Sequence, residues 1–267
     1  MRASLLALTI VTLAACGGPQ RAAPPDALDD PALVFEGTLD RLSLLDAARL
    51  RAELEYYGRD GRARVEQVVL AREPGDVRIE TLSPFGTTLT VFTLSGDALQ
   101  FWDLQAERFI VGASRPEHIG LFIPFALSAA DVVRVLLGAP PLDRVTPEPD
   151  RYTLSWDARR AAYRLRMPLA EGDGELSVWV KHETYTLVAA REVDGEGRVV
   201  FELRAGRFER ERVGDALIEV PGRLEFEMPR EGVDISLDLT DAEWNPSLVD
   251  ALFELREPRG VTVDVLP

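Results

Sequence analysis

The feature that most limits how this chain can fold is a period-two alternation of apolar and polar side chains. Such alternation places apolar side chains on one face of a β-strand and polar side chains on the other. It is clearest in residues 50–56, 152–156, 163–167, 176–180, 199–203, 224–228 and 233–239. The pattern predicts a mainly β fold, of the α+β kind, in which an antiparallel sheet covers one apolar core.

Turn-forming sequences separate the alternating segments. Clusters of Gly, Asp, Glu, Arg, Pro and Ser occupy residues 59–61, 74–76, 95–97, 172–174, 194–197 and 230–232, and such clusters are typical of hairpin turns. Residues 152–156 and 163–167 flank a short turn and read as one hairpin. About ten to twelve strands fit this template, which is enough for a strongly bent sheet or an unclosed antiparallel barrel.

Residues 115–137 break the alternation and have helical spacing instead. Pro116 suits the first turn of a short helix that extends to Phe122, and Pro124 interrupts it. Ser128 is a candidate N-cap for a second helix, which ends at Gly138. These two helices are predicted to lie between two halves of the sheet. Residues 33–46, despite Gly37, and residues 248–255 are further predicted helices.

The N-terminus has the order of a bacterial export signal. Arg2 is followed by an uncharged apolar run over residues 3–15, which is too short to span a bilayer as a mature helix. The run ends in Leu-Ala-Ala-Cys16, which resembles the lipobox of bacterial lipoproteins, where cleavage precedes a lipidated cysteine. The alternative is an ordinary secretory signal with a coincidental cysteine. Cys16 is the chain's only cysteine, so no disulfide can form within it.

These features divide the chain into three parts. Residues 1–15 are predicted to be the signal peptide, residues 16–31 a flexible tether rich in Gly, Pro and Asp, and residues 32–267 one folded domain. Two or three acyl chains on Cys16 would anchor the chain stably to a membrane. Gly17 rather than aspartate follows the cysteine, which in the sorting logic of enteric bacteria favours the outer membrane, facing the periplasm.

Charge and motif content exclude several classes of function. The formal net charge is -15, with 45 acidic and 30 basic side chains, so the chain would repel nucleic acid. His118 and His182 are the only histidines, and neither has metal-ligand spacing, so each is predicted to be structural or exposed. No nucleophile elbow or phosphate-binding loop occurs. We predict no catalytic residues, no cofactor and no metal site.

Three stretches carry a resemblance to the lipoprotein-localisation proteins LolA and LolB. Residues 83–89, Ser-Pro-Phe-Gly-Thr-Thr-Leu, are similar to the Asn-Pro-Leu-Gly-Ser-Thr loop of LolB. Residues 127–140 resemble the LolB helix that closes with Leu-Gly-x-Pro, and residues 253–264 are similar to the C-terminal end of LolA. The resemblance covers residues 32–267, but the strands and hairpins after Pro141 are longer than is typical of LolB.

The resemblance implies an unclosed barrel with a helical lid over an apolar cavity that holds lipoprotein acyl chains. Each methylene transferred from water into such a cavity contributes about 0.8 kcal/mol. The candidate cavity and lid residues are Leu54, Tyr56, Ile79, Val91, Phe101, Phe122, Val132, Leu136, Tyr152, Leu154 and Trp156. The alternative for each of them is a place in a filled core.

The resemblance also assigns a role to the loop containing Pro84, Phe85 and Gly86. In LolB the apolar residue between the proline and the glycine protrudes and contacts the membrane. The corresponding Phe85 is predicted at the exposed tip of a turn between two strands. The alternative is an aromatic ring folded back over the edge of the sheet.

Two functions follow from this resemblance. The first is a monomeric outer-membrane receptor that accepts lipoprotein cargo from a periplasmic LolA-like carrier and inserts it into the membrane. The lipid anchor on Cys16 favours this receptor over a freely diffusing carrier. The second is a non-transferring envelope lipoprotein of the same fold that senses or holds lipid or protein.

Overall fold

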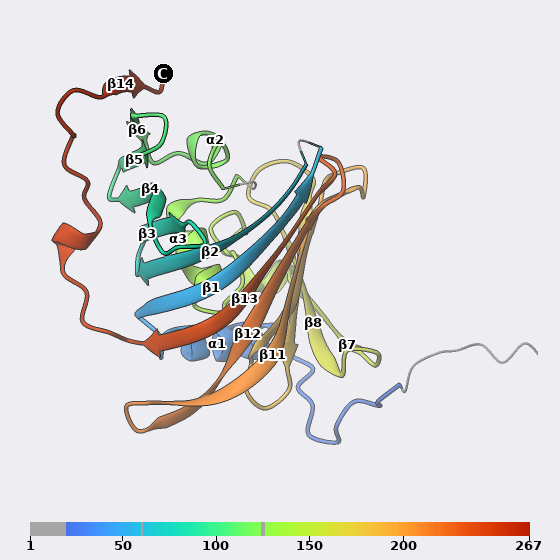
Figure 1. Ribbon diagram of the computed structural model, residues 1–267. Helices are drawn as coiled ribbons and strands as arrows, with labels where there is room; N and C mark the ends of the chain where they lie inside the picture. Colours follow the sequence, from blue (N-terminus) through green and yellow to red (C-terminus); the bar gives the residue numbers. More distant parts are fainter. Residues whose placement is uncertain (1–19, 60, 124–125) are drawn as a thin grey trace, which may run out of the picture.

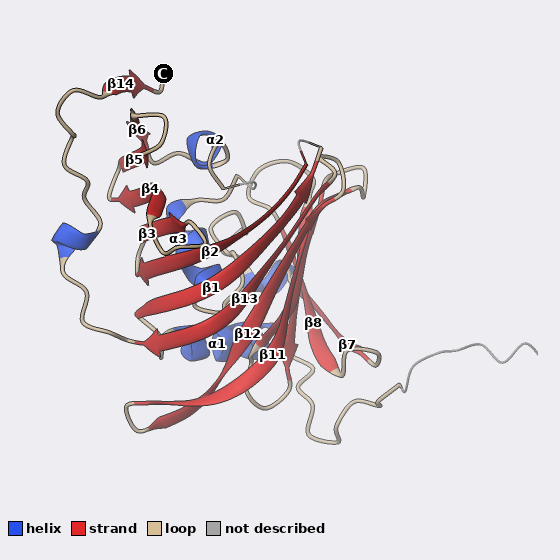
Figure 2. Cartoon of the chain, viewed as in Figure 1, coloured by secondary structure: helices blue, strands red, loops and turns tan. Residues whose placement is uncertain are grey.

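The computed structural model describes residues 20–59, 61–123 and 126–267. In this part of the chain, 14 strands form one open sheet in the order β14-β6-β5-β4-β3-β2-β1-β13-β12-β11-β10-β9-β8-β7 (Figures 1 and 2). The first six strands are β1 (Ala47–Gly58), β2 (Gly61–Arg72), β3 (Asp76–Leu82), β4 (Thr88–Ser95), β5 (Ala98–Asp103) and β6 (Arg108–Ala113). The next seven are β7 (Thr153–Asp157), β8 (Ala162–Pro168), β9 (Glu175–Lys181), β10 (Leu187–Val193), β11 (Val199–Val213), β12 (Ala216–Met228) and β13 (Val233–Trp244). The mainly β, unclosed architecture predicted from the alternation is confirmed.

The sheet consists of two antiparallel meanders that meet along one seam. Strands β1 and β13 form this seam, with Leu54 opposite Leu237 and Tyr56 opposite Ile235. The connection between β6 and β7 carries two helices, α2 (Pro116–Ile119) and α3 (Ala129–Leu136). Figure 2 shows these helices on the concave side of the bent sheet, as the predicted lid requires.

The helices begin where the sequence offers caps. The side chain of Asp30 accepts the Ala32 N–H at the start of α1 (Pro31–Leu42), and that of Ser128 accepts the Asp131 N–H at the start of α3. The helix predicted over residues 33–46 is therefore present but lies a few residues earlier. Gly37 is tolerated within it because the Tyr185 ring lies against this position, where an added Cβ would be 2.7 Å from Cζ.

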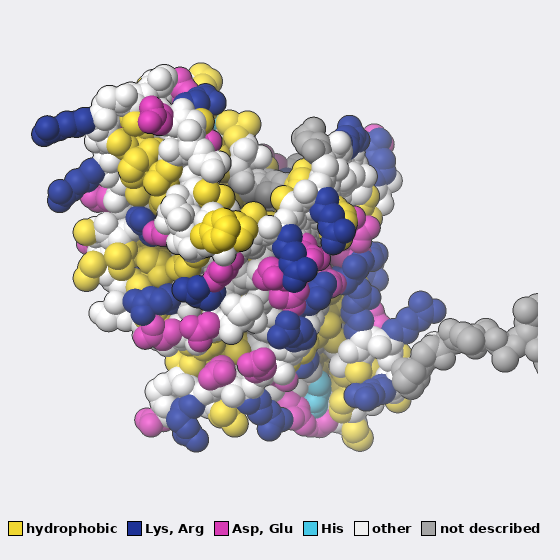
Figure 3. All heavy atoms as spheres, viewed as in Figure 1, with side chains coloured by type: hydrophobic (Ala, Val, Ile, Leu, Met, Phe, Trp, Pro, Cys, Tyr) yellow, Lys and Arg dark blue, Asp and Glu magenta, His cyan; other side chains and the backbone are white. Residues whose placement is uncertain are grey.

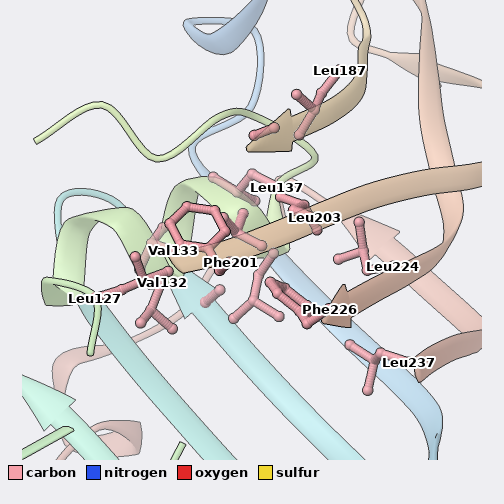
Figure 4. Close-up of a cluster of buried hydrophobic side chains, with 14 of the residues drawn as sticks. Leu127, Val132, Val133, Leu137, Leu187, Phe201, Leu203, Leu224, Phe226 and Leu237 are labelled. Carbon is pink, nitrogen blue, oxygen red and sulfur yellow. The ribbon is translucent and has the colours of Figure 1, made fainter. Parts of the chain in front are cut away.

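The main core lies between the concave face of the sheet and the helices. Apolar side chains from both meanders join the residues of the lid in one continuous cluster. In Figure 4, Leu127, Val132 and Val133 of the lid lie close to Phe201, Leu203 and Phe226 of the sheet. A smaller cluster on the convex face contains Ala47, Leu70, Leu248 and Phe253, so the segment after β13 covers part of that face.

Three expectations need correction. The helix predicted over residues 248–255 is wrong, because only one 3-10 turn, η2 (Asp250–Leu252), is present. The guanidinium groups of Arg72 and Arg78 donate to the carbonyls of Leu248 and Leu252, which holds this segment across the sheet. The strand number is higher than expected, and β14 (Thr262–Val265) is parallel to β6 in an otherwise antiparallel sheet.

The described part of the predicted tether contacts the domain. Residues 20–30 run along β7 and β8 before α1 begins (Figure 1). Pro124, expected to interrupt the lid, and Cys16 lie outside the described residues.

Candidate lipid-binding site

An apolar cavity of about 140 Å³ lies between α3 and the concave face of the sheet. Its described lining residues are all uncharged and come from both meanders and the lid. They are Leu54, Gln67, Val69, Ile79, Thr81, Thr90, Phe92, Phe101, Phe122, Ile123, Val132, Val135, Leu136, Phe226, Ile235 and Leu237. A cavity of this composition excludes charged ligands and favours hydrocarbon.

Strand register brings the sheet side of the cavity together. Ile79 on β3 is opposite Phe92 on β4, and Phe92 is opposite Phe101 on β5. The ring of Phe122, from the lid, lies 5.6 Å from the Phe92 ring and 4.6 Å from the Phe101 ring. The lid therefore closes this end of the cavity through aromatic contacts.

The size of the cavity limits what the closed state can hold. An apolar protein cavity of roughly 150 Å³ accommodates a molecule of the size of benzene, and the present cavity is of that order. A fatty-acyl chain is several times longer than such a ligand. A whole chain therefore does not fit within this volume, and it would have to displace α3 and Phe122 or extend beyond the cavity.

A polar cluster holds the second lid helix in place. Asp131 is 1% exposed, and it accepts the N–H groups of Leu142 and Asp143 at 2.7 and 3.1 Å and the Arg134 guanidinium at 2.9 Å. Burial raises the pKa of Asp131, although the hydrogen bonds from Asp143 and Arg134 oppose that shift. Because Arg134 also pairs with Asp143, the cluster ties α3 to the chain that follows it.

Six of the eleven predicted cavity and lid residues line the cavity. These are Leu54, Ile79, Phe101, Phe122, Val132 and Leu136. Tyr56 is partly buried against the main core but is not among the lining residues. Val91 points to the convex face, because its neighbours Thr90 and Phe92 line the cavity and successive side chains alternate between the faces of a strand.

Tyr152, Leu154 and Trp156 lie away from the cavity and have packing roles. The Tyr152 ring contacts Phe35 of α1 at 5.2 Å, and its hydroxyl donates to the Thr146 carbonyl. Leu154 packs against the main core. The indole N–H of Trp156 donates to the Arg21 carbonyl. These residues fill the end of the sheet that α1 and residues 20–30 cover.

Phe85 lies in the turn between β3 and β4, and its side chain is 95% exposed. The Ser83 hydroxyl accepts the N–H groups of Phe85 and Thr87 at 3.2 and 3.1 Å, and Gly86 has a φ of 79°. These features form a tight turn that holds the Phe85 ring away from the apolar surface of the domain. The placement agrees with the expected turn tip, whereas the role in membrane contact stays a prediction.

Sequence reasoning did not name ten of the lining residues: Gln67, Val69, Thr81, Thr90, Phe92, Ile123, Val135, Phe226, Ile235 and Leu237. Phe226, Ile235 and Leu237 belong to segments whose alternation was recognised, and only the seam between β1 and β13 places them beside Leu54. Gln67 and Thr81 are polar and hydrogen-bonded to each other at 3.4 Å, so the alternation carried no signal for them.

Both histidines are at least partly buried. His118 is buried, with Nδ1 2.9 Å from the Ala113 carbonyl, and His182 lies among Asp26, Trp156 and Tyr163. Across the described ranges, no group of three or more His, Cys, Asp or Glu side chains is placed to hold a metal ion. None of the helices described is both long enough and apolar enough to cross a membrane.

Comparison with solved structures identifies the fold. The chain is similar to a Vibrio parahaemolyticus domain assigned to outer membrane lipoprotein sorting, with a TM-score of 0.58 and 12% identity over 84% of this chain and 97% of that one. It is also similar to a DUF1329 family protein from Desulfovibrio piger, with a TM-score of 0.57 and 16% identity over 85% of this chain and 98% of that one. A LolA superfamily protein from Nitrosomonas europaea is similar with a TM-score of 0.56 and 15% identity, over 86% of this chain and 99% of that one.

Comparison with models of protein families gives no match, and neither does comparison with curated protein sequences. The likeness therefore rests on the arrangement of the strands and helices. The chain has the LolA/LolB-like fold, and the resemblance expected from its sequence is confirmed at the level of the fold.

Proposed function

We propose that this protein is a lipid-anchored envelope lipoprotein that binds the acyl chains of other lipoproteins under α3 and helps insert them into the outer membrane. The uncharged cavity between the lid and the sheet is the observation that carries the proposal. Burial of hydrocarbon there needs no specific polar partner, since each methylene contributes about 0.8 kcal/mol.

The anchor distinguishes a receptor from a carrier. A chain lipidated on Cys16 stays on its membrane, so it would receive cargo from a soluble LolA-like carrier in the periplasm. Phe85 would then be the group that meets the bilayer when cargo is inserted, because its exposed ring has no packing role in the domain. A monomer is sufficient for these steps.

The closed lid favours a second candidate, a lipoprotein that senses or holds lipid without transferring it. The cavity of about 140 Å³ is smaller than an acyl chain requires, and Asp131 fixes α3 through several hydrogen bonds. A regulator could use an acyl chain to open this lid and expose a surface for another protein.

Binding is tested with a fluorescent fatty-acyl probe and the mature domain. Leu136 lines the cavity and Leu217 is 60% exposed on the hairpin of β11 and β12, so Leu136→Trp should abolish saturable probe binding while Leu217→Trp should leave it unchanged. Equal binding by both variants would place the probe on the surface.

Transfer is tested separately in cells. If the protein is a receptor, its depletion should leave other lipoproteins in the periplasm or the inner membrane, which fractionation detects. If lipoproteins sort normally while the probe still binds under α3, the sensing or holding role is favoured instead. Acyl labelling of a Cys16→Ala chain tests the anchor, since labelling of that variant would contradict lipidation of Cys16.

A further inference from the structure

Three polar side chains, Gln67, Thr81 and Thr90, cross an otherwise apolar wall of the cavity and are here called the polar row. Gln67 on β2 is directly opposite Thr81 on β3, and Thr81 is directly opposite Thr90 on β4. Figure 1 shows these three strands side by side. Directly opposed side chains point to the same face of a sheet, so the register brings the three polar groups together. All three are half-buried.

The polar row has a defined place beside the apolar part of this wall. The next cavity-facing residue on each of the three strands is apolar, namely Val69, Ile79 and Phe92. Two residues of a strand span roughly 6.6 Å, so the two rows are adjacent. On β3 and β4 the polar row is closer than the apolar one to the turn that carries Phe85. A ligand with its hydrocarbon beside Ile79 and Phe92 would therefore have its polar end toward this turn.

The polar row has unused hydrogen-bonding groups. The Gln67 side-chain amide donates to the Thr81 hydroxyl at 3.4 Å, which is long for a hydrogen bond. Among the described residues, neither Thr81 nor Thr90 has an acceptor for its hydroxyl hydrogen, and the Gln67 side-chain oxygen has no donor. A ligand oxygen can therefore accept a hydrogen bond here without breaking a strong one within the protein.

Charge beside the polar row disfavours an anionic ligand. None of the described residues that line the cavity is charged. Asp103 on β5 is opposite Thr90, and its carboxylate accepts two backbone N–H groups of the following turn at 2.9 Å. Arg108, opposite Asp103 on β6, is paired with Asp264. A carboxylate or phosphate beside Thr90 would therefore lack a free cation and would lie near the negative charge of Asp103.

The charged side chains of β1 and β2 lie on the convex face. Arg51 pairs with Glu66, and Arg64 pairs with Glu53. Successive side chains alternate between the faces of a strand, so Glu66 points away from the cavity that Gln67 lines. Figure 3 shows dark blue and magenta side chains gathered over β1, β13 and β12 on this convex face. The polar groups that these strands present to the cavity are thus neutral.

We propose that the polar row binds the carbonyl oxygen of an acyl ester or amide whose hydrocarbon lies under α3. This inference rests on the proposed binding of acyl chains, and it makes the polar row the determinant that selects a neutral acyl group over a free fatty acid or a lipid phosphate. A threonine hydroxyl or the Gln67 amide donates to the carbonyl oxygen, which orients the head of the ligand toward the β3–β4 turn. One neutral hydrogen bond should raise the affinity about five-fold.

Calorimetry with the mature domain at pH 8 compares four ligands that share an eight-carbon chain. The ligand 1-octanoylglycerol carries an ester carbonyl, N-octanoylethanolamine carries an amide carbonyl, 1-O-octylglycerol has an ether in place of the ester, and octanoate is anionic. We expect the ester, the amide or both to bind about five-fold more tightly than the ether, and octanoate to bind most weakly. A preference for only one of the two carbonyl ligands identifies whether the ester or the amide is recognised.

The variant Gln67→Met/Thr81→Val/Thr90→Val keeps the approximate shapes of the three side chains and removes their hydrogen-bonding groups. It should bind the carbonyl ligands and the ether with equal affinity. The matched control is Thr93→Val, also on β4. The Thr93 hydroxyl is buried without a partner among the described residues, and it points away from the cavity because its neighbour Phe92 lines the cavity. This control should keep the preference of the parent.

Equal affinity of the parent for the carbonyl ligands and the ether overturns the inference, as does tightest binding of octanoate. A preference that persists in the triple variant, or that is lost in the control, also overturns it. If Leu136→Trp still blocks binding in these cases, acyl chains bind in the cavity and the proposed function stands. If no ligand binds, both are overturned.

Infrared spectroscopy decides the question if the triple variant does not fold. The carbonyl of 1-octanoylglycerol, labelled with carbon-13 and bound to the parent, should absorb at lower wavenumber than the same ester in hexane, because a hydrogen bond weakens the carbonyl bond. An unshifted band overturns the inference.

Discussion

At the scale of single residues, Phe85 and Phe253 show how the same side chain takes opposite places. Phe85 is 95% exposed because a glycine-containing reversal holds it away from the sheet, whereas Phe253 is 0% exposed. The Arg72 guanidinium lies over the Phe253 ring at 4.8 Å, and residues 248–255 hold this ring on the convex face. Both phenylalanines belong to motifs that resemble the Lol proteins, so motif membership alone does not determine burial.

Because Phe85 is exposed, its substitution should change function without changing stability. Substitution of a fully exposed side chain usually changes the free energy of unfolding by no more than about 0.5 kcal/mol. Phe85→Glu should therefore melt like the parent protein but fail to insert lipoproteins into vesicles or into the outer membrane. Leu217→Glu, at another exposed apolar position, is the control and should retain insertion. An unfolded Phe85→Glu protein would make Phe85 a packing residue.

A second residue-scale prediction concerns Glu202 on the convex face of β11. Its carboxylate is 8% exposed and pairs with Arg160, Arg191 and Arg204. Burial alone would raise its pKa, but the hydrogen bond and charge of Arg191, together with Arg204, hold the pKa below its ordinary value. Glu202→Gln should lower the free energy of unfolding by about 2 kcal/mol at neutral pH.

The pH dependence of this effect has a defined sign. Because the folded-state pKa of Glu202 is lowered, the unfolded chain takes up the proton first as the pH falls below the ordinary glutamate value of about 4.3. The stabilisation is thus complete above that pH and is lost below it. Denaturant titrations across this range should show less pH dependence in Glu202→Gln. The control Glu227→Gln is 42% exposed and pairs with Arg204, so a similar loss in this variant would contradict the assignment.

The sequence predicts which residues of a strand face the cavity where only one face of the strand is covered. It does not predict them where both faces of the strand are covered. In β4 the order Thr90-Val91-Phe92-Thr93 places two apolar residues in succession, so the alternation does not determine which one faces the cavity. The lid covers the concave face and the segment after β13 covers the convex one, through contacts such as Gln100 to Leu255. The prediction of Val91 as a cavity residue is therefore wrong, and its neighbour Phe92 lines the cavity instead.

At the scale of elements, caps and turns were predictable because they depend on neighbouring residues. Ser128 begins α3 and Gly138 follows its end, as the sequence indicated. The segment after β13 was not predictable, since its carbonyls are satisfied by Arg72 and Arg78, which are about 175 residues earlier in the chain. A segment with a helical sequence pattern does not form a helix when distant side chains bind the backbone carbonyls that the helix would use.

Gly138 provides the element-scale prediction, because it follows the lid helix and packs against β12. Its φ is 74°, and an added Cβ would lie 2.7 Å from Cδ of Pro221 on β12. Gly138→Ala should reduce the free energy of unfolding by about 3 kcal/mol, since left-handed strain and overpacking act together. Gly214→Ala has similar strain, at a φ of 57°, but no atom within 4 Å, and should cost about 1 kcal/mol. Equal losses, measured by urea titration, would show that contact with Pro221 has no effect.

At the scale of the whole molecule, the seam between β1 and β13 determines the site. It pairs Leu54 with Leu237 across more than 180 positions of sequence, and a period-two pattern specifies faces but not which distant strands become neighbours. The unclosed sheet and its lid were therefore predictable from the sequence and the Lol resemblance. The contribution of β12 and β13 to the cavity needed the structure.

The seam also makes the cavity part of the global fold, because its lining joins β1–β5, the lid, β12 and β13. An acyl ligand that binds there only in the folded state should raise the stability of the whole domain. At a free concentration of 100 times its Kd the gain is about 2.7 kcal/mol, which corresponds to a rise in Tm of about 5–10 °C for a domain of this size. The Tm should increase with the logarithm of ligand concentration, as calorimetry or circular dichroism can measure.

Variants of the lid decide whether this stabilisation comes from the cavity. Leu136→Trp fills space between α3 and the sheet, so its Tm should no longer respond to the acyl ligand, even if the unliganded variant melts at a lower temperature. Val132→Phe, at another lining position, should respond less than the parent for the same reason. Leu217→Trp should show the full rise. If all three variants shift like the parent, the ligand stabilises the fold from the surface, and the space under α3 is a packing defect of the core rather than a binding site.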